Sequence, residues 1–200
     1  MANNLATLRN LLLLTLALLA GIVTAYILSP QSSPSGQPMF KTLGGNFTLQ
    51  GVNGDVSLHD FKGKVVVIYI GYTHCPDVCP TSLAVISQAM KNLDANQREQ
   101  IQPIFISVDP DRDTPEQLAE YSAFFHPSFI GVTGSREVID QVVSQYGAFY
   151  RIVEMKDSAM GYAVDHSSRI YLINKQGELS NTVAHGAPPE QLVTEIKELL

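Results

Sequence analysis

The hydrophobic pattern of the chain begins with one long apolar run near the N-terminus. Residues 11–28 read LLLLTLALLAGIVTAYIL, and no charged side chain occurs between Arg9 and Lys41. About 20 apolar residues cross the hydrocarbon core of a bilayer as a helix, whereas a helix of a globular domain keeps a polar face. The run is longer than the apolar core of a cleavable signal peptide, and no small-residue cleavage pattern follows it. The sequence therefore predicts an uncleaved transmembrane anchor over residues 11–28.

The segments on either side of this run predict its orientation. Residues 1–10 carry Arg9 and the α-amino group as their only charges, and positive charge favours the cytoplasmic side of a membrane. Residues 29–39, SPQSSPSGQPM, have the composition of a flexible linker. We therefore expect a short cytoplasmic N-terminus, a single pass through the inner (cytoplasmic) membrane, a linker, and a domain of residues 40–200 in the periplasm.

Beyond residue 40, apolar and polar positions follow the rhythm of alternating strands and helices. Residues 65–70 and 104–108 are continuous β-branched and aromatic runs, the pattern of strands buried on both faces of a parallel sheet. Thr114, with Gln117 three residues later, predicts the capped start of a helix that ends near Phe125. Further strands are expected at residues 129–133, 150–153, 163–165, 169–173 and 178–183, and further helices from Thr81, from Ser135 to Tyr146, and from residue 188 to the C-terminus.

Two features interrupt this rhythm. A hairpin is predicted at the start of the domain, where apolar positions between Phe47 and Leu58 flank the turn signal Asn53-Gly54. An inserted loop is predicted at residues 154–162, before the penultimate strand. Parallel strands alternating with helices, then a hairpin and a final helix, predict an α/β sandwich of thioredoxin type. In such a sheet a ligand site lies at the carboxyl end of the central strand, here after residue 70.

Charge and cysteine content narrow the candidate chemistry. The 200 residues carry a formal net charge of −6, which argues against nucleic acid as a partner. The only two cysteines, Cys75 and Cys79, both lie in the stretch GYTHCPDVCP at residues 71–80, directly after the predicted central strand. A disulfide that closes so short a loop removes little conformational entropy from the unfolded chain. The two thiols are therefore expected to be functional rather than purely structural.

The local setting of the cysteines predicts reactive or metal-binding thiols. Pro80 suits the first turn of a helix, so Cys79 is expected at or near the N-cap. Unpaired N–H groups and the helix dipole stabilise a thiolate there, so a lowered pKa is expected for Cys79, with Cys75 as the second candidate. Helical partners four residues apart have Cβ atoms about 5–6 Å apart, which suits two thiolates on one metal ion better than a disulfide. A disulfide stays open, because Cys75 is expected to precede the helix.

Five histidines are available to complete a metal site. His74 is expected to line the site, and solvent exposure is expected for His59 and His126. His166 closes the predicted insert just before the strand 169–173, where Asp165 and Ser167 are placed to hydrogen-bond its ring or to order its loop. From position alone, a metal ligand and a surface residue are equally good interpretations of His166.

Three stretches in this order resemble one known family. GYTHCPDVCP at 71–80, VDPDRDTP at 108–115 and VDHSSRIYLI at 164–173 are similar to the motifs of the Sco/SenC family of membrane-anchored copper-binding proteins. The resemblance implies a thioredoxin-like fold and one copper ion, Cu(I) or Cu(II), held by Cys75, Cys79 and His166. It also implies a role in the maturation of the dinuclear CuA centre in subunit II of cytochrome c oxidase.

Three functions remain open at this point. The first is a copper metallochaperone that supplies subunit II or another exported copper acceptor, for which all three ligands are needed. The second is a thiol-disulfide reductase in which Cys75 and Cys79 are the catalytic pair; its weakness is that the CxxxC spacing differs from the C-x-x-C of redox enzymes. The third is a copper or redox sensor. For Asp109, Asp111, Arg112 and Asp113 of the second stretch, a turn with a helix cap and a role beside the metal are equally good interpretations.

Overall fold

A computed structural model describes residues 2–28, 43–155, 158 and 160–200 of the chain. The chain divides into two units, Met1–Gln37 and Pro38–Leu200. The predicted linker, residues 29–39, lies outside the described residues, so its expected flexibility stays a prediction.

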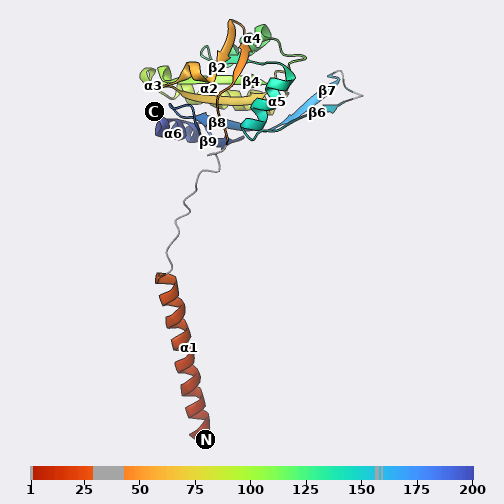
Figure 1. Cartoon of the computed structure of the whole chain (residues 1–200). Helices are drawn as coiled ribbons and strands as arrows, with labels where there is room; N and C mark the ends of the chain where they lie inside the picture. The colour runs from red at the N-terminus through yellow and green to blue at the C-terminus, as the bar shows by residue number, and fades with distance from the viewer. Residues whose placement is uncertain (1, 29–42, 156–157, 159) are drawn as a thin grey trace. The chain divides into compact units, whose positions relative to one another are not determined.

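The first unit is a single helix, α1 (Ala2–Leu28), shown at the N-terminal end of the chain in Figure 1. It starts nine residues before the apolar run. Leucines along its middle are exposed, among them Leu8, Leu14 and Leu18. Within the residues that the structure describes, no helix combines the length and the hydropathy needed to cross a membrane.

The second unit is built on a five-stranded sheet in the order β5-β4-β3-β8-β9. The strand β3 lies in the centre, parallel to β4 on one side and antiparallel to β8 on the other. The bounds of the strands are β3 (Val65–Gly71), β4 (Ile101–Ser107), β5 (Ile130–Val132), β8 (Arg169–Ile173) and β9 (Leu179–Ala184). All residues of β3 and β4 are buried, as their continuous apolar runs predict.

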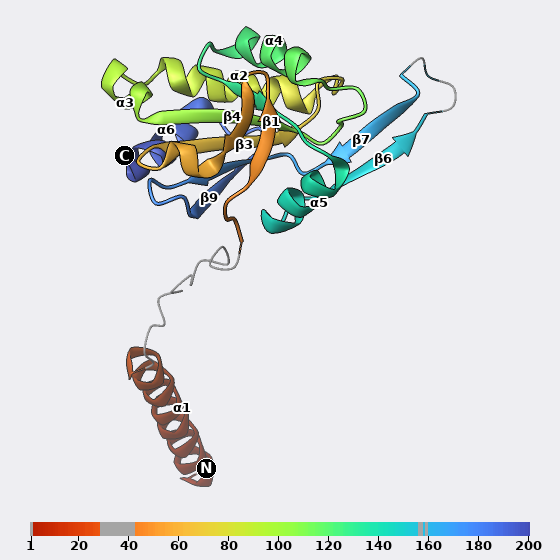
Figure 2. The ribbon, with the colours of Figure 1, turned by 45° about the horizontal axis from the view of Figure 1, so that its top comes forward.

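Helices cover both faces of this sheet, as Figure 2 shows, so the predicted α/β sandwich is confirmed. On one face, α2 packs against α6 and α4. The ring centres of Tyr121 in α4 and Phe105 in β4 are 5.5 Å apart. On the opposite face, Tyr146 at the end of α5 contacts Tyr171 of β8 edge to face at 5.8 Å. The helices are α2 (Val78–Lys91), the short α3 (Ala95–Glu99), α4 (Pro115–Phe125), α5 (Arg136–Gln145) and α6 (Pro189–Leu199).

The helix-start signals in the sequence were correct for α4 and α5. Thr114 caps α4 in a capping box with Gln117, and the Ser135 side chain accepts a hydrogen bond from the backbone N–H of Val138 in α5. The short helix α3 has its own capping box at Asp94 and was not predicted.

The predicted N-terminal hairpin is present, but its turn is one residue earlier than expected. The strands β1 (Thr48–Gly51) and β2 (Gly54–Ser57) pair with Gly51 opposite Gly54, so Val52 and Asn53 occupy the turn. Gly54 has φ 111°, a conformation that favours glycine, and it opens the second strand rather than ending the turn. A 3₁₀ helix, η2 (Leu58–Phe61), follows at once.

The two strands predicted on either side of the inserted loop pair to form a second hairpin. The strands β6 (Tyr150–Glu154) and β7 (Tyr162–His166) form a separate two-stranded antiparallel sheet. Figures 1 and 2 show this hairpin, called the arm below, projecting away from the main sheet. Its second strand ends at His166, so the candidate ligand lies at the base of a regular element.

Candidate metal centre

The candidate ligands meet where β3 ends and β8 begins. Because β8 runs antiparallel to β3, with Tyr69 opposite Ile170, the start of β8 lies beside the end of β3. The chain that leaves β3 carries Cys75 and Cys79, and the chain that enters β8 carries His166. The predicted position at the carboxyl end of the central strand is therefore correct.

Two sulfurs and one imidazole nitrogen converge at this point. The Sγ atoms of Cys75 and Cys79 and one ring nitrogen of His166 all lie within 4.8 Å of one another. Sγ of Cys79 is 3.2 Å from Nε2 of His166. Cys79 is fully buried, Cys75 is 8% exposed, and both thiols are free. Among the described histidines, His166 is therefore the one whose ring nitrogen lies beside the cysteine pair.

The helix that carries Cys79 begins earlier than predicted. Asp77 occupies the N-cap position without a side-chain hydrogen bond, and α2 starts at Val78. Cys79 and Pro80 are therefore the second and third residues of the helix, not its cap and first residue. A proline is tolerated there because the first N–H groups of a helix have no partner within it.

The pKa values of the two thiols differ in the opposite sense from the one expected: that of Cys75 is lowered and that of Cys79 is raised. The hydrogen bond from Cys79 lowers the pKa of the Cys75 thiol to about 3; burial opposes this shift, whereas hydrogen bonds with His166 and with the backbone N–H groups of Asp77 and Cys79 add to it. Burial raises the pKa of the Cys79 thiol above its usual range, and the hydrogen bond and charge of the Cys75 thiolate act in the same direction. The prediction that Cys79 is the thiolate was wrong, because burial against the sheet outweighs the helix N-terminus.

A glycine creates the space for the buried sulfur. A Cβ atom added to Gly71, the last residue of β3, would lie 2.5 Å from Sγ of Cys79. No carbon approaches a sulfur that closely without displacing it. Gly71 therefore allows Cys79 to sit directly against the end of the central strand.

The ring of His166 is held from several sides. Its Nδ1 lies 3.1 Å from the carbonyl oxygen of Ser167 and donates to it, so Nε2 is the ring nitrogen that faces the cysteines. The rings of Tyr69 and Tyr72 contact it edge to face, at 6.2 and 5.8 Å. Asp165 does not bond the ring; its carboxylate pairs with Arg151 across the arm at 2.6 Å.

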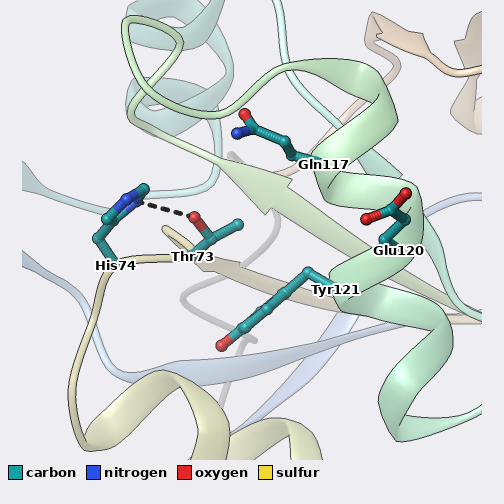
Figure 3. Close-up of a pocket in the computed structure, with 5 residues that line it drawn as sticks. All are labelled: Thr73, His74, Gln117, Glu120 and Tyr121. Atoms are coloured by element: carbon teal, nitrogen blue, oxygen red, sulfur yellow. Dashed lines mark hydrogen bonds between the residues drawn. The ribbon is translucent and has the colours of Figure 1, made fainter.

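The other histidines lie outside the cluster. His74 was expected to line the site, but Figure 3 shows it beside a separate pocket with Thr73, Gln117, Glu120 and Tyr121. Its Nδ1 is 3.0 Å from Oγ1 of Thr73. His59 is exposed as expected, whereas His126 is half-buried and burial lowers its pKa. Nδ1 of His185 lies 3.0 Å from Oγ of the buried Ser82 in α2.

Sequence reasoning left the segment 109–113 undecided, and the structure shows it to be part of the surroundings of the site. Asp109 and Asp113 are fully buried. Asp113 accepts hydrogen bonds from the backbone N–H of Thr73 at 2.9 Å and from the Thr73 and Ser107 hydroxyls, so it fixes the chain that leads to Cys75. A signal was present in the sequence: three aspartates next to a buried strand, more than one helix cap requires.

This set of donors suits a soft metal ion. Thiolates favour Cu(I) and Zn²⁺, and an imidazole accommodates Cu(II) as well as Zn²⁺. Three ligands leave a coordination position open, which is a property of sites where a metal or a substrate is exchanged.

Comparisons with known proteins agree with the family resemblance seen in residues 71–80, 108–115 and 164–173. The family model described as SCO1/SenC matches residues 35–200. An SCO2-like protein of Rickettsia conorii is 36% identical over 191 residues, which cover 90% of this chain and 93% of that protein. The solved structure of Bradyrhizobium japonicum ScoI with copper bound has a TM-score of 0.71 and 37% identity, and the match covers 79% of this chain and 99% of that one.

A third comparison adds a described role. BsSco, whose structure is described as that of a member of the Sco family of cytochrome c oxidase assembly proteins, has a TM-score of 0.63 and 25% identity to this chain; the match covers 80% of this chain and 94% of BsSco. The likeness to these structures confirms the thioredoxin-like fold predicted from the sequence. With most of its length matched by one family model and by a relative above 30% identity, the chain belongs to the SCO1/SenC family.

Proposed function

We propose that this chain binds one copper ion through Cys75, Cys79 and His166 and supplies it to an exported acceptor, the CuA site in subunit II of cytochrome c oxidase. One observation carries the proposal: two thiols and an imidazole from distant parts of the chain have their donor atoms within 4.8 Å of one another. The two thiols are free, and the Ser167 carbonyl holds the ring of His166 so that Nε2 faces them.

The protonation of the cluster fits metal uptake. Cys75 is ionised at neutral pH and attracts the ion first, while Cys79 keeps its proton until the metal displaces it. Two thiolates hold Cu(I), and Nε2 of His166 adds the borderline ligand that Cu(II) prefers. The copper-bound ScoI of Bradyrhizobium japonicum and the assembly role described for BsSco support copper as the metal and oxidase assembly as the setting.

The site residues give a direct test. The reduced full chain is titrated anaerobically with Cu(I) and, separately, with Cu(II). We expect one copper per chain and a sulfur-to-Cu(II) charge-transfer absorption. Binding should be lost in Cys75→Ser/Cys79→Ser and weakened in His166→Ala. The control is His59→Ala, which removes an exposed histidine far from the cluster in the sequence and should change nothing. Binding that is indifferent to His166 would overturn the three-ligand site.

Delivery needs a second measurement. The copper-loaded chain is mixed with an apo, reduced CuA domain of subunit II, and the characteristic absorption of the dinuclear centre is followed. Appearance of that absorption together with loss of copper from this chain supports a donor. Copper that stays on this chain while the domain accepts free copper would instead indicate a sensor.

We also propose that the domain is tethered to the periplasmic face of the inner membrane, with the first residues in the cytoplasm. The support is the uncharged run of residues 11–28 and the exposed leucines of α1. Membranes of cells that express the chain are washed with carbonate at high pH, and reporter enzymes are fused to either end. Release by the wash, or a C-terminal reporter active in the cytoplasm, would contradict the tether.

A thiol-disulfide reductase is the second candidate function. The observation that favours it is the pairing of Cys75, whose pKa is lowered, with Cys79, whose pKa is raised, since such a pair has one attacking and one resolving thiol. This function requires both cysteines but not His166. Reduction of an oxidised CuA domain by His166→Ala at the parent rate, without any effect of copper, would favour the reductase over the metallochaperone.

A further inference from the structure

The segment 109–113 stands between the two parts of the chain that carry the candidate ligands. Asp113 holds Thr73 on the side of the cysteines. On the other side, Asp109 and Arg112 face the arm, whose strand β7 ends in His166. A surface turn with a helix cap has no need of two fully buried aspartates, so this segment has a further role.

Arg112 binds the backbone at the start of β7. One of its terminal nitrogens, Nη1, donates to the carbonyl oxygens of Tyr162 at 3.0 Å and Met160 at 3.2 Å. Its guanidinium carbon lies 3.6 Å from the centre of the Tyr162 ring, a stacked cation–π contact. The same group lies 5.6 Å from the ring of Tyr72, on the chain that leads to the cysteines.

Asp109 completes a closed set of contacts with these two side chains. One carboxylate oxygen accepts from Nε of Arg112 at 2.6 Å, and the other accepts from the hydroxyl of Tyr162 at 2.7 Å. Asp109 is fully buried and the Arg112 side chain is 17% exposed, so the ion pair is shielded from solvent. We call Asp109, Arg112 and Tyr162 the clamp.

The clamp acts at a point from which β7 runs directly to the ligand. Tyr162 is the first and His166 the last residue of this five-residue strand. Between them, the backbone N–H of Val164 donates to the hydroxyl of Tyr72 at 3.3 Å, so the strand is also tied to the cysteine side. An extended strand has little freedom to absorb a displacement, so the position of Tyr162 determines where the imidazole of His166 points.

We propose that Arg112 is a positioning residue that, through Tyr162 and the strand β7, holds Nε2 of His166 at the cysteine pair. The inference rests on the proposed copper site. Because the clamp acts on the imidazole and not on the thiols, its loss should affect Cu(II), which depends on the nitrogen ligand, more than Cu(I), which two thiolates retain.

The first test compares Arg112→Ala with the parent full chain and with Arg151→Ala. Arg151 lies on the arm that Arg112 contacts, and it too pairs with an aspartate. Its ion pair is exposed, so Arg151→Ala serves as the matched control. We expect Arg112→Ala to weaken Cu(II) binding about 10- to 100-fold, as loss of a residue that orients a ligand does. The charge-transfer and electron paramagnetic resonance spectra should shift toward those of His166→Ala. Arg151→Ala should keep the parent affinity and spectra.

A double-mutant cycle separates positioning from a general structural effect. If Arg112 acts through His166, Arg112→Ala should weaken Cu(II) binding in the parent but cause no further loss in the His166→Ala background. Equal losses in both backgrounds would overturn the inference. Tyr162→Phe is a milder variant, since it keeps the ring that stacks on Arg112 and removes only the bond to Asp109. It should shift the spectra in the same direction by a smaller amount, and unchanged spectra would count against the clamp.

The outcomes distinguish this inference from the proposed function. If the parent binds copper, His166→Ala weakens it and Arg112→Ala behaves like the parent, only the positioning role of Arg112 fails. If the parent chain binds no copper at all, the copper site fails and the positioning role falls with it.

Discussion

Sγ of Cys79 lies 3.2 Å from Nε2 of His166 although 87 positions separate the two residues in the chain. Nδ1 of the same ring donates to the Ser167 carbonyl, so Nε2 is the nitrogen that faces the sulfurs. Sγ of Cys79 therefore lies close to both other candidate ligand atoms, this nitrogen and Sγ of Cys75.

Copper uptake should release one proton, and its source should be Cys79. Since the pKa of Cys79 is raised and that of Cys75 is lowered to about 3, one thiol is protonated and the other ionised throughout pH 7–8. Displacement of one proton makes the Cu(I) affinity rise about tenfold per pH unit in that range. Competition with a Cu(I) chelator, corrected for the chelator's own titration, measures this slope. A slope of two would show that both thiols are protonated before binding.

The two cysteines should also differ in reactivity. Iodoacetamide reacts with thiolates, so in the folded, metal-free chain Cys75 should be alkylated at pH 5–7 while Cys79 is spared. Digestion and mass spectrometry identify the modified residue. In guanidinium chloride both should react alike, and only as the pH approaches about 8.5. Preferential alkylation of Cys79 in the folded chain would contradict this assignment.

Gly71→Ala should damage the site and the fold together. The new Cβ would meet Sγ of Cys79 at 2.5 Å, so the sulfur must move away from the strand. We expect a loss of about 1–3 kcal/mol in the free energy of unfolding and a clear loss of copper affinity. The matched control is Gly131→Ala, whose Cβ would meet the carbonyl oxygen of Leu118 at 2.5 Å. It should destabilise similarly in urea denaturation while the folded fraction binds copper normally.

Asp113→Asn should cost stability because an amide nitrogen replaces one of two acceptor oxygens. The backbone N–H and hydroxyl of Thr73 and the hydroxyl of Ser107 all donate to this carboxylate. We expect a loss of about 2 kcal/mol in the free energy of unfolding, typical of buried hydrogen bonds to a charged group. Asp111→Asn, two residues away, changes an exposed ion pair with Arg136 and should cost less than about 1 kcal/mol. Equal losses would argue against the buried role of Asp113.

Local signals predicted most of the elements correctly. The apolar runs located β3 and β4, the caps at Thr114 and Ser135 located two helices, and β8 has the bounds expected of it. These features depend on residues close together in the chain, so sequence patterns contain them. The short helix α3 and the turn of the first hairpin depend on competition between similar local conformations, and there the patterns were insufficient.

The chemistry of the site was only partly predictable for a different reason. The sequence placed both cysteines at the end of the central strand, but it assigned the low pKa to Cys79. Which thiol is ionised depends on which one is buried against Gly71 and Tyr69, and that is a property of the packed structure. The same holds for Arg112, whose partners Met160 and Tyr162 lie about fifty positions further along the chain.

The place of β8 beside the central strand β3 links metal uptake to biosynthesis. A chain that has reached only β5 has its cysteines but neither the histidine nor the strand that brings it beside β3. Such an intermediate closes no three-ligand site, because His166 and β8 are not yet part of the chain. Binding of copper by all three ligands would then require that the final third of the protein has been synthesised and has folded. An ion met before that moment would be held by two sulfurs alone and would exchange more readily.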